Sequence, residues 1–175
     1  MLKPEEVRGV LLPDAYIKEH GVSYYSLTDE YYYDENGFYH YERMFDKPME
    51  EGGKPFTGVA FEVYEDSDQI GFYTELKDGY DFGDYVGFYE NGALRFYTRM
   101  DEKEHYTYEW YENGILKKMV EFYRKRGQTH RSRESEWYED GVLKKETEWH
   151  EKGGRFFSCS KEYDETGKLI RESRD

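Results

Sequence analysis

Aromatic and aliphatic residues alternate with polar ones along most of this chain, in short runs separated by Asn-Gly or Asp-Gly pairs. Before one such pair the aromatic residues occupy alternate positions; they are Tyr106, Tyr108 and Trp110. After it the apolar residues again share a parity; they are Leu116, Val120 and Phe122. A period of two is typical of β-strands, and a central Asn-Gly pair is typical of a hairpin with a two-residue type I′ turn. The pattern predicts β-hairpins, each with one apolar and one polar face.

The hairpin pattern repeats along the chain. WYENGILKK at residues 110–118 returns 27 residues later as WYEDGVLKK at 137–145. FYENGALRF at 88–96 precedes these copies, and EYDETGKLI at 162–170 follows them. The predicted turn residues are Asn91, Gly92, Asn113, Gly114, Asp140, Gly141 and Gly167. One hairpin buries too few side chains to fold alone, so repeats of this kind stack on their neighbours. We therefore predict an all-β fold of consecutive antiparallel β-hairpins stacked into an elongated, twisted sheet.

The first 53 residues do not follow the repeat. Pro4, the acidic residues after it and Pro13 predict a short helix or turn near the start of the chain. A weaker echo of the repeat, YYDENGFYHY at 32–41, predicts a hairpin around Asn36 and Gly37. We expect residues 1–53 to form an irregular N-terminal cap, a short helix or turn plus a hairpin. Residues 54–175 are expected to form the repeat array.

Charge and composition narrow the classes of partner. The 175-residue chain has a formal net charge of −14, and residues 1–100 carry 21 acidic against 9 basic side chains. Such a field repels nucleic acid and anionic lipid and attracts basic proteins. The mean hydropathy is −1.11, but 19% of the residues are aromatic and supply side chains that pack well on a sheet. We expect neither nucleic acid nor membrane as a direct ligand.

Residues that could carry catalysis or bind a metal lack the necessary patterns. Five histidines have no metal-ligand spacing, and we interpret His105, His130 and His150 as solvent-side residues. Cys159, the only cysteine, lies in an alternating run typical of a strand, and we interpret it as a core or surface thiol, because a nucleophile would need an activating base nearby. The glutamates of the repeat recur with the turn, whereas an active site is a single irregular constellation. We expect no enzyme activity, no cofactor and no metal. The single cysteine and the missing apolar leader favour a cytoplasmic location.

The motif Trp/Phe-Tyr-Glu-Asn/Asp-Gly-x-Leu at spacings of 22 to 27 residues resembles the MORN repeat in its bacterial variant form. Together with KPFTGVAFE at 54–62, the order of the copies resembles the YwqK family of bacterial antitoxin or immunity proteins, over residues 54–172. The resemblance implies a toxin–antitoxin system in which this chain binds and occludes a cognate, basic toxin domain. Two open edges of the array make self-association possible but not required, so we expect a monomer or weak homodimer. The alternative is a scaffold or peripheral phosphoinositide-binding MORN-repeat protein.

An acidic, tyrosine-rich stretch at residues 62–84 is the candidate binding surface for such a toxin. It contains eight acidic residues and one lysine, Lys77. Carboxylates can oppose Lys and Arg of a partner, while tyrosines provide rigid anchors. The alternative is that this stretch is only a solvated acidic face. The predicted contact residues are Asp66, Asp68, Asp78, Asp81, Asp84, Tyr64, Tyr73, Tyr80 and Tyr85.

Overall fold

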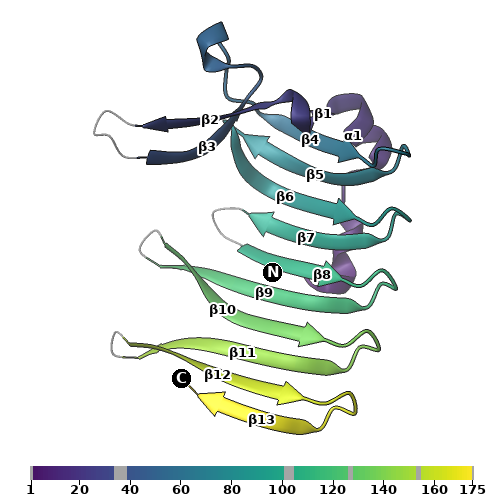
Figure 1. Ribbon diagram of the computed structural model, residues 1–175, viewed down its shortest axis with the longest axis vertical. Helices are drawn as coiled ribbons and strands as arrows, with labels where there is room; N and C mark the ends of the chain where they lie inside the picture. The colour runs from purple at the N-terminus through teal and green to yellow at the C-terminus, as the bar shows by residue number, and fades with distance from the viewer. Residues whose placement is uncertain (1, 34–38, 101–104, 126–127, 153–154, 175) are drawn as a thin grey trace. The chain divides into compact units, whose positions relative to one another are not determined.

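The protein is all-β, with consecutive antiparallel strands and few helices, as predicted. The computed structural model describes residues 2–33, 39–100, 105–125, 128–152 and 155–174, and Figure 1 labels their helices and strands. The chain forms two compact units. One consists of residues 10–92 and is called the 10–92 unit; the other consists of residues 93–175 with residues 1–9 and is called the 93–175 unit. The sequence predicts a boundary between an N-terminal cap and a repeat array at residues 53 and 54, and this boundary stays a prediction.

The 10–92 unit is built on a four-stranded sheet of order β1-β4-β5-β6, in which β1 runs parallel to β4 and the other neighbours are antiparallel. Its elements are α1 (Asp14–His20), β1 (Val22–Ser23), η2 (Tyr24–Ser26), β2 (Thr28–Tyr33), β3 (Tyr39–Phe45), η3 (Met49–Glu51), β4 (Gly58–Val63), β5 (Ile70–Lys77) and β6 (Tyr80–Phe88). Strands β2 and β3 form the separate antiparallel hairpin that the sequence predicts. Its expected turn residues, Asn36 and Gly37, lie outside the described residues.

Both faces of this sheet are covered near its centre. Helix α1 follows Pro13, whose fixed φ and missing N–H suit the start of a helix, and it packs against β4. On that face Ile17 and Tyr73 are fully buried, and the Leu12 N–H donates to the Tyr73 hydroxyl at 3.2 Å. On the opposite face Leu76 packs in a cluster with Met44. The irregular segment before β4 thus completes the core of this unit.

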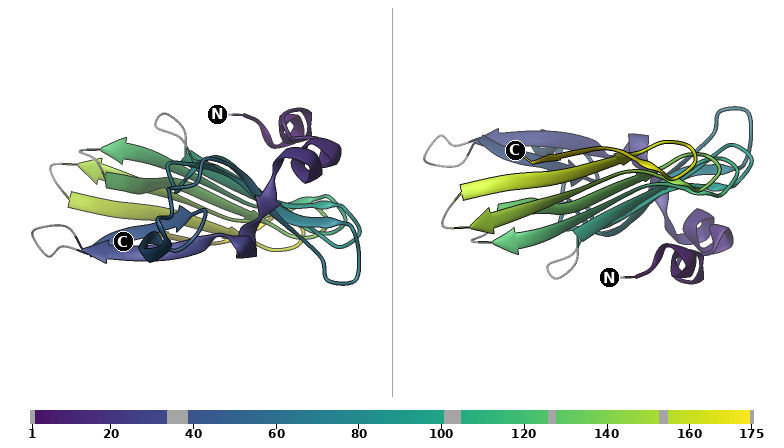
Figure 2. Two further views of the ribbon diagram at one scale, coloured as in Figure 1. Left: turned by 90° about the horizontal axis from the view of Figure 1, so that it is seen from above. Right: turned by 90° about the horizontal axis from the view of Figure 1, so that it is seen from below.

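The 93–175 unit is a seven-stranded antiparallel sheet whose strands follow chain order. Its elements are η1 (Pro4–Gly9), β7 (Leu94–Met100), β8 (His105–Trp110), β9 (Leu116–Lys125), β10 (Gln128–Trp137), β11 (Leu143–Lys152), β12 (Arg155–Tyr163) and β13 (Leu169–Arg174). The segment containing η1 lies beside the strands near the N-terminus of the chain (Figure 2). Hydrogen bonds join it to β8: the Tyr108 hydroxyl donates to the Leu2 carbonyl at 2.7 Å, and the Leu2 N–H donates to the Tyr106 hydroxyl at 3.3 Å.

The expectation of one apolar face for each hairpin is wrong. In the β8–β9 pair Thr107 lies opposite Val120 and Tyr108 lies opposite Met119, so paired residues have numbers of opposite parity. Directly opposite residues in an antiparallel pair share a face. The even-numbered residues of the two strands therefore point to opposite faces, with Tyr108 on one and Val120 on the other. Apolar side chains are therefore divided between both faces of the hairpin.

The turns of the repeat are hairpin turns at the predicted positions, but they are not of type I′. The Tyr111 N–H donates to the Ile115 carbonyl at 2.9 Å, which encloses a three-residue loop. Gly114 has a φ of +85°, whereas Asn113 has no positive φ. The Asn113 Oδ1 instead accepts the Ile115 N–H at 2.9 Å and stabilises the turn from its side chain. The same three-residue loop ends at Gly141 and Gly167. Two consecutive positive φ values, as type I′ requires, occur at Asp78 and Gly79 between β5 and β6.

The recurring tyrosine of the motif connects each hairpin to the next. The Tyr111 hydroxyl donates to the Trp137 carbonyl at 2.9 Å, and the Tyr138 hydroxyl donates to the Tyr163 carbonyl at 3.0 Å. In the 10–92 unit the Tyr64 hydroxyl makes the corresponding bond to the Phe88 carbonyl at 2.8 Å. The last copy has Asp164 at this position. These bonds explain why Tyr recurs immediately before the turn.

Candidate functional site

The net charge of the protein is confined to one unit. The 10–92 unit contains 19 Asp and Glu residues against 5 Lys and Arg residues, which gives −14. The 93–175 unit contains 20 of each and is formally neutral. A division of the sequence at residue 100 hides this separation, because residues 1–9 and 93–100 belong with the neutral unit. Electrostatic attraction of a basic partner is therefore a property of the 10–92 unit.

Cross-strand ion pairs neutralise the strands of the 93–175 unit. Lys118 Nζ lies 2.8 Å from Glu134 and 3.6 Å from Glu136, and Lys145 lies 3.4 Å from Glu162. Partial burial by itself raises the pKa of Glu134, but the hydrogen bond and charge of Lys118 outweigh it and lower that pKa. Burial lowers the pKa of Lys118, and the same bond with the charge of Glu134 outweighs it and raises that pKa. Both groups stay charged near neutral pH, so neither exchanges a proton there.

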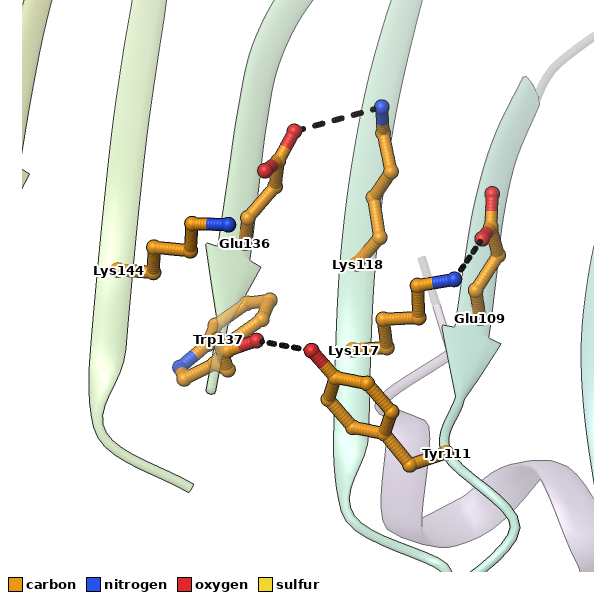
Figure 3. A pocket seen from close by; sticks show the side chains of 7 residues that line it. All are labelled: Glu109, Tyr111, Lys117, Lys118, Glu136, Trp137 and Lys144. Carbon is orange, nitrogen blue, oxygen red and sulfur yellow. Dashed lines mark hydrogen bonds and ion pairs between the residues drawn. The ribbon is translucent and has the colours of Figure 1, made fainter. Parts of the chain in front are cut away.

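A hollow of about 250 Å³ lies beside this ion pair and opens between neighbouring hairpins (Figure 3). Its lining combines three lysines, two glutamates and two aromatic residues: Glu109, Tyr111, Lys117, Lys118, Glu136, Trp137 and Lys144. Lys117 lies 3.9 Å from Glu109, and Lys144 lies over the Tyr138 ring at 5.6 Å. The Tyr111 hydroxyl is used in its bond to the Trp137 carbonyl. The charged groups and the Tyr111 hydroxyl therefore all have partners within the unit.

The predicted contact residues of the 10–92 unit divide into exposed and internal ones. Asp66 and Asp68 are exposed in the loop between β4 and β5, Asp78 is exposed in the β5–β6 turn, and Asp81 and Tyr80 are exposed on β6. These five residues can contact a partner, and their role as an interface stays a prediction.

The other four residues have structural roles that make them poor anchors. Tyr73 is 0% exposed and Asp84 is 7% exposed, so neither is available to a partner on this surface. The Asp84 N–H donates to Glu75 at 2.9 Å. Tyr64 is half-buried and donates to the Phe88 carbonyl, while Tyr85 packs edge-on against Phe72 with ring centroids 5.9 Å apart. The sequence pattern identified aromatic positions here but not the helix and neighbouring strands that cover them.

Asp81 has an unusual electrostatic environment for an exposed residue. Desolvation by the surrounding protein atoms raises the pKa of its carboxyl, although the residue as a whole is exposed. The Thr74 hydroxyl donates to Asp81 Oδ1 at 3.2 Å and partly offsets this effect. A cation brought to this carboxyl stabilises its charged form.

Two aromatic rings near the β5–β6 turn hold cations of the protein itself. The Arg43 guanidinium lies 4.9 Å from the Tyr80 ring centroid, and its Nε donates to the Asp78 carbonyl at 3.0 Å. The Lys77 ammonium lies 4.8 Å from the Phe82 ring centroid. Phe82 is 41% exposed and was not predicted as a site residue. The sequence signal that could have identified Phe82 is its position two residues after Tyr80 in the same run. The approach of Arg43 to the Tyr80 ring depends on tertiary structure and could not be predicted in this way.

The histidines of the 93–175 unit pack against aromatic rings. His105 stacks on Phe122 with centroids 4.3 Å apart, and His130 stacks between Tyr123 and Phe156 at 5.3 and 5.7 Å. Burial, with the nearby charge of Arg124, lowers the pKa of His105. Within the described parts of the chain, His, Cys, Asp and Glu side chains form no group of three or more suited to a metal ion. These histidines are therefore packing residues as well as solvent-side ones.

Comparison with known proteins does not assign the chain to a family. A scan against protein-family models and a search of curated proteins found no match. The resemblance to MORN repeats thus rests on the repeated motif itself. Among the described helices, none is long and apolar enough to cross a membrane.

Proposed function

We propose that this chain is a protein-binding module, not an enzyme, and that its 10–92 unit binds a basic protein. The observation that carries the proposal is the concentration of the whole net charge of −14 in that unit. In accordance with the resemblance to bacterial antitoxins, the partner is a cognate toxin domain. This chain then acts as a cytoplasmic antitoxin or immunity protein that occludes the active site or substrate channel of that toxin.

The charge distribution suits rapid capture of such a partner. An excess of 14 negative charges on one unit accelerates encounter with a basic surface, and the effect weakens as salt screens it over a Debye length of about 8 Å at physiological ionic strength. Exposed carboxylates such as Asp66 and Asp68 contribute to the association rate, while buried aromatic contacts set the residence time.

The direct test uses the protein encoded by the neighbouring reading frame of the genome. We expect the two proteins to co-purify, and we expect the association rate to fall by about tenfold or more as salt is raised from low to physiological concentration. The absence of a complex would reject the antitoxin role. A complex whose association rate does not depend on salt would reject the acidic unit as its binding surface.

Two charge-reversal double variants, one in each unit, test which unit binds the partner. The double variant Asp66→Lys with Asp68→Lys should slow association, because it shifts the charge of the exposed β4–β5 loop by +4. Glu139→Lys with Glu165→Lys changes the net charge equally, at exposed turn positions of the 93–175 unit, and should slow it less. Equal slowing by both variants would mean that net charge alone acts and that the unit has no special role.

The alternative of a phosphoinositide-binding scaffold makes the opposite prediction for membranes. The full chain should remain unbound in a flotation assay with vesicles that contain phosphoinositide, because the 10–92 unit repels anionic lipid. Flotation of the chain with these vesicles, but not with neutral ones, would favour the scaffold over the antitoxin.

A further inference from the structure

We infer that Tyr80 and Phe82, with the Asp78 carbonyl beside Tyr80, form a receptor for arginine and lysine side chains of the basic partner. This inference rests on the proposed function and names the part of the acidic unit that would recognise the partner. It differs from a general acidic surface because it assigns the recognition to two aromatic rings.

The two rings are placed for such a role. Tyr80 and Phe82 are two residues apart on β6, so both side chains point to the same face and lie about 7 Å apart along the strand. They are 39% and 41% exposed, which is high for aromatic residues within a strand. Asp78 precedes them in the turn, whereas Asp81 lies between them in the sequence and its carboxylate accepts a hydrogen bond from Thr74. Exposed aromatic rings bind guanidinium and ammonium groups through the ring quadrupole.

The protein's own cations show that these rings accept such groups. The 10–92 unit has 5 Lys and Arg residues, and two of them lie over these rings: Arg43 at 4.9 Å from the Tyr80 centroid and Lys77 at 4.8 Å from the Phe82 centroid. Arg43 also donates from Nε to the Asp78 carbonyl at 3.0 Å. This combination of ring and oxygen acceptor is one that an incoming arginine can use.

Competition between internal and incoming cations follows from this arrangement. Lys77 is exposed and has a flexible side chain, so its ammonium can leave the Phe82 ring at low cost. A partner cation that occupies the ring must displace it. Removing the internal cation should therefore strengthen binding of a cationic ligand, whereas removing the ring should weaken it. If only long-range attraction by the net charge acted, removing the ring would leave the binding affinity unchanged.

The experiment measures binding of a fluorescently labelled octa-arginine peptide to the full chain by anisotropy, at low and at physiological salt. The double variant Tyr80→Leu with Phe82→Leu keeps apolar bulk but removes both rings, and should weaken binding by about five- to tenfold. Tyr25→Leu is the matched control, because Tyr25 is an aromatic residue of the same unit that is 80% exposed, and it should leave the affinity unchanged. Phe82→Tyr, which retains a ring, should bind like the parent protein.

A second pair of variants tests the competition. Lys77→Gln should strengthen peptide binding by about two- to threefold more than Lys47→Gln. Both substitutions remove one positive charge at an exposed lysine of the same unit, but only Lys77 lies over a ring. Melting curves of all variants establish that the fold is retained.

The outcomes separate this inference from the proposed function. If the protein binds octa-arginine and the double leucine variant binds equally well, the rings are not the receptor, while an acidic binding surface remains. Equal effects of Lys77→Gln and Lys47→Gln would likewise reject the competition. If the parent protein does not bind the peptide even at low salt, the proposed basic partner is rejected together with its receptor.

Discussion

A single methyl group added at Gly114 tests the backbone geometry on which the repeat depends. Gly114 ends the three-residue turn with a φ of +85°, and a Cβ built there meets no atom within 4 Å. Gly114→Ala therefore introduces no steric overlap with neighbouring groups. Its cost is that of placing an L-residue in the left-handed region, about 1–2 kcal/mol. Part of this cost is offset because alanine restricts the unfolded chain more than glycine does.

A matched substitution removes the unfolded-state contribution from the comparison. A Cβ at Gly9 also meets nothing within 4 Å, but the backbone there does not have a positive φ. Gly9→Ala and Gly114→Ala change the unfolded chain in the same way, so the difference between them isolates the left-handed strain of about 1–2 kcal/mol. For a chain of this size that difference corresponds to roughly 2–8 °C in melting temperature.

Thermal unfolding followed by circular dichroism measures this difference. We expect Gly114→Ala to melt several degrees below Gly9→Ala, and Gly114→Asn to melt between Gly114→Ala and the parent protein because asparagine tolerates the left-handed region. Equal melting temperatures for the two alanine variants would refute the assigned turn geometry. A Gly114→Asn variant as unstable as Gly114→Ala would show that the loss has another cause.

Further predictions concern the bonds between repeats and the balance of charge. Tyr138→Phe deletes the hydroxyl that donates to the Tyr163 carbonyl. It should lower the free energy of unfolding by about 0.5–1.5 kcal/mol in denaturant titrations. An unchanged free energy of unfolding would contradict the role of this bond in connecting the two hairpins. The pKa of Glu134 is lowered from its ordinary value of 4.5, so the stability that this group contributes is present above pH 4.5 and is lost as the pH falls through the lower folded pKa. Glu134→Gln should therefore flatten the decline of melting temperature on acidification below pH 4.5, and an unchanged decline would reject this assignment. Raising salt should slow hydrogen exchange in the 10–92 unit, where it screens self-repulsion, and not in the ion-paired 93–175 unit; equal slowing of exchange in both units would contradict the charge separation.

The strands, the hairpins and the positions of the repeat turns could be predicted from the sequence because they depend on local chemistry. Period-two alternation and the recurring Asn-Gly and Asp-Gly pairs identify them without tertiary information. The turn type could not be predicted from the dipeptide alone, since the Asn113 side chain stabilises a three-residue loop through the Ile115 N–H. At Asp78 and Gly79 the dipeptide does form the type I′ turn of which it is typical, since both φ values are positive.

The candidate site was predictable only in part, for a related reason. Alternation shows which residues share a face of a strand, but not which part of that face another element covers. Tyr73 and Tyr80 are both tyrosines of the same acidic stretch, yet α1 and the segment before it bury Tyr73, while Tyr80 remains exposed near the turn. Arg43 reaches the Tyr80 ring from β3, a separate hairpin of the unit. The approach of two segments that are distant in sequence leaves no mark in a local pattern.

The separation of charge between the units changes what the net charge of the protein implies. A uniformly acidic array would repel itself along its whole length, and each hairpin would lose stability through that repulsion. In the 93–175 unit the repeated lysines of the motif prevent this, because residues such as Lys118 and Lys145 lie opposite glutamates of the next hairpin. The motif therefore supplies lysines that neutralise the glutamates of neighbouring strands, whereas the excess of carboxylates lies in the 10–92 unit. With 19 acidic and 5 basic residues, the 10–92 unit cannot neutralise its own charge, and this excess is the physical basis for proposing that a basic partner binds there.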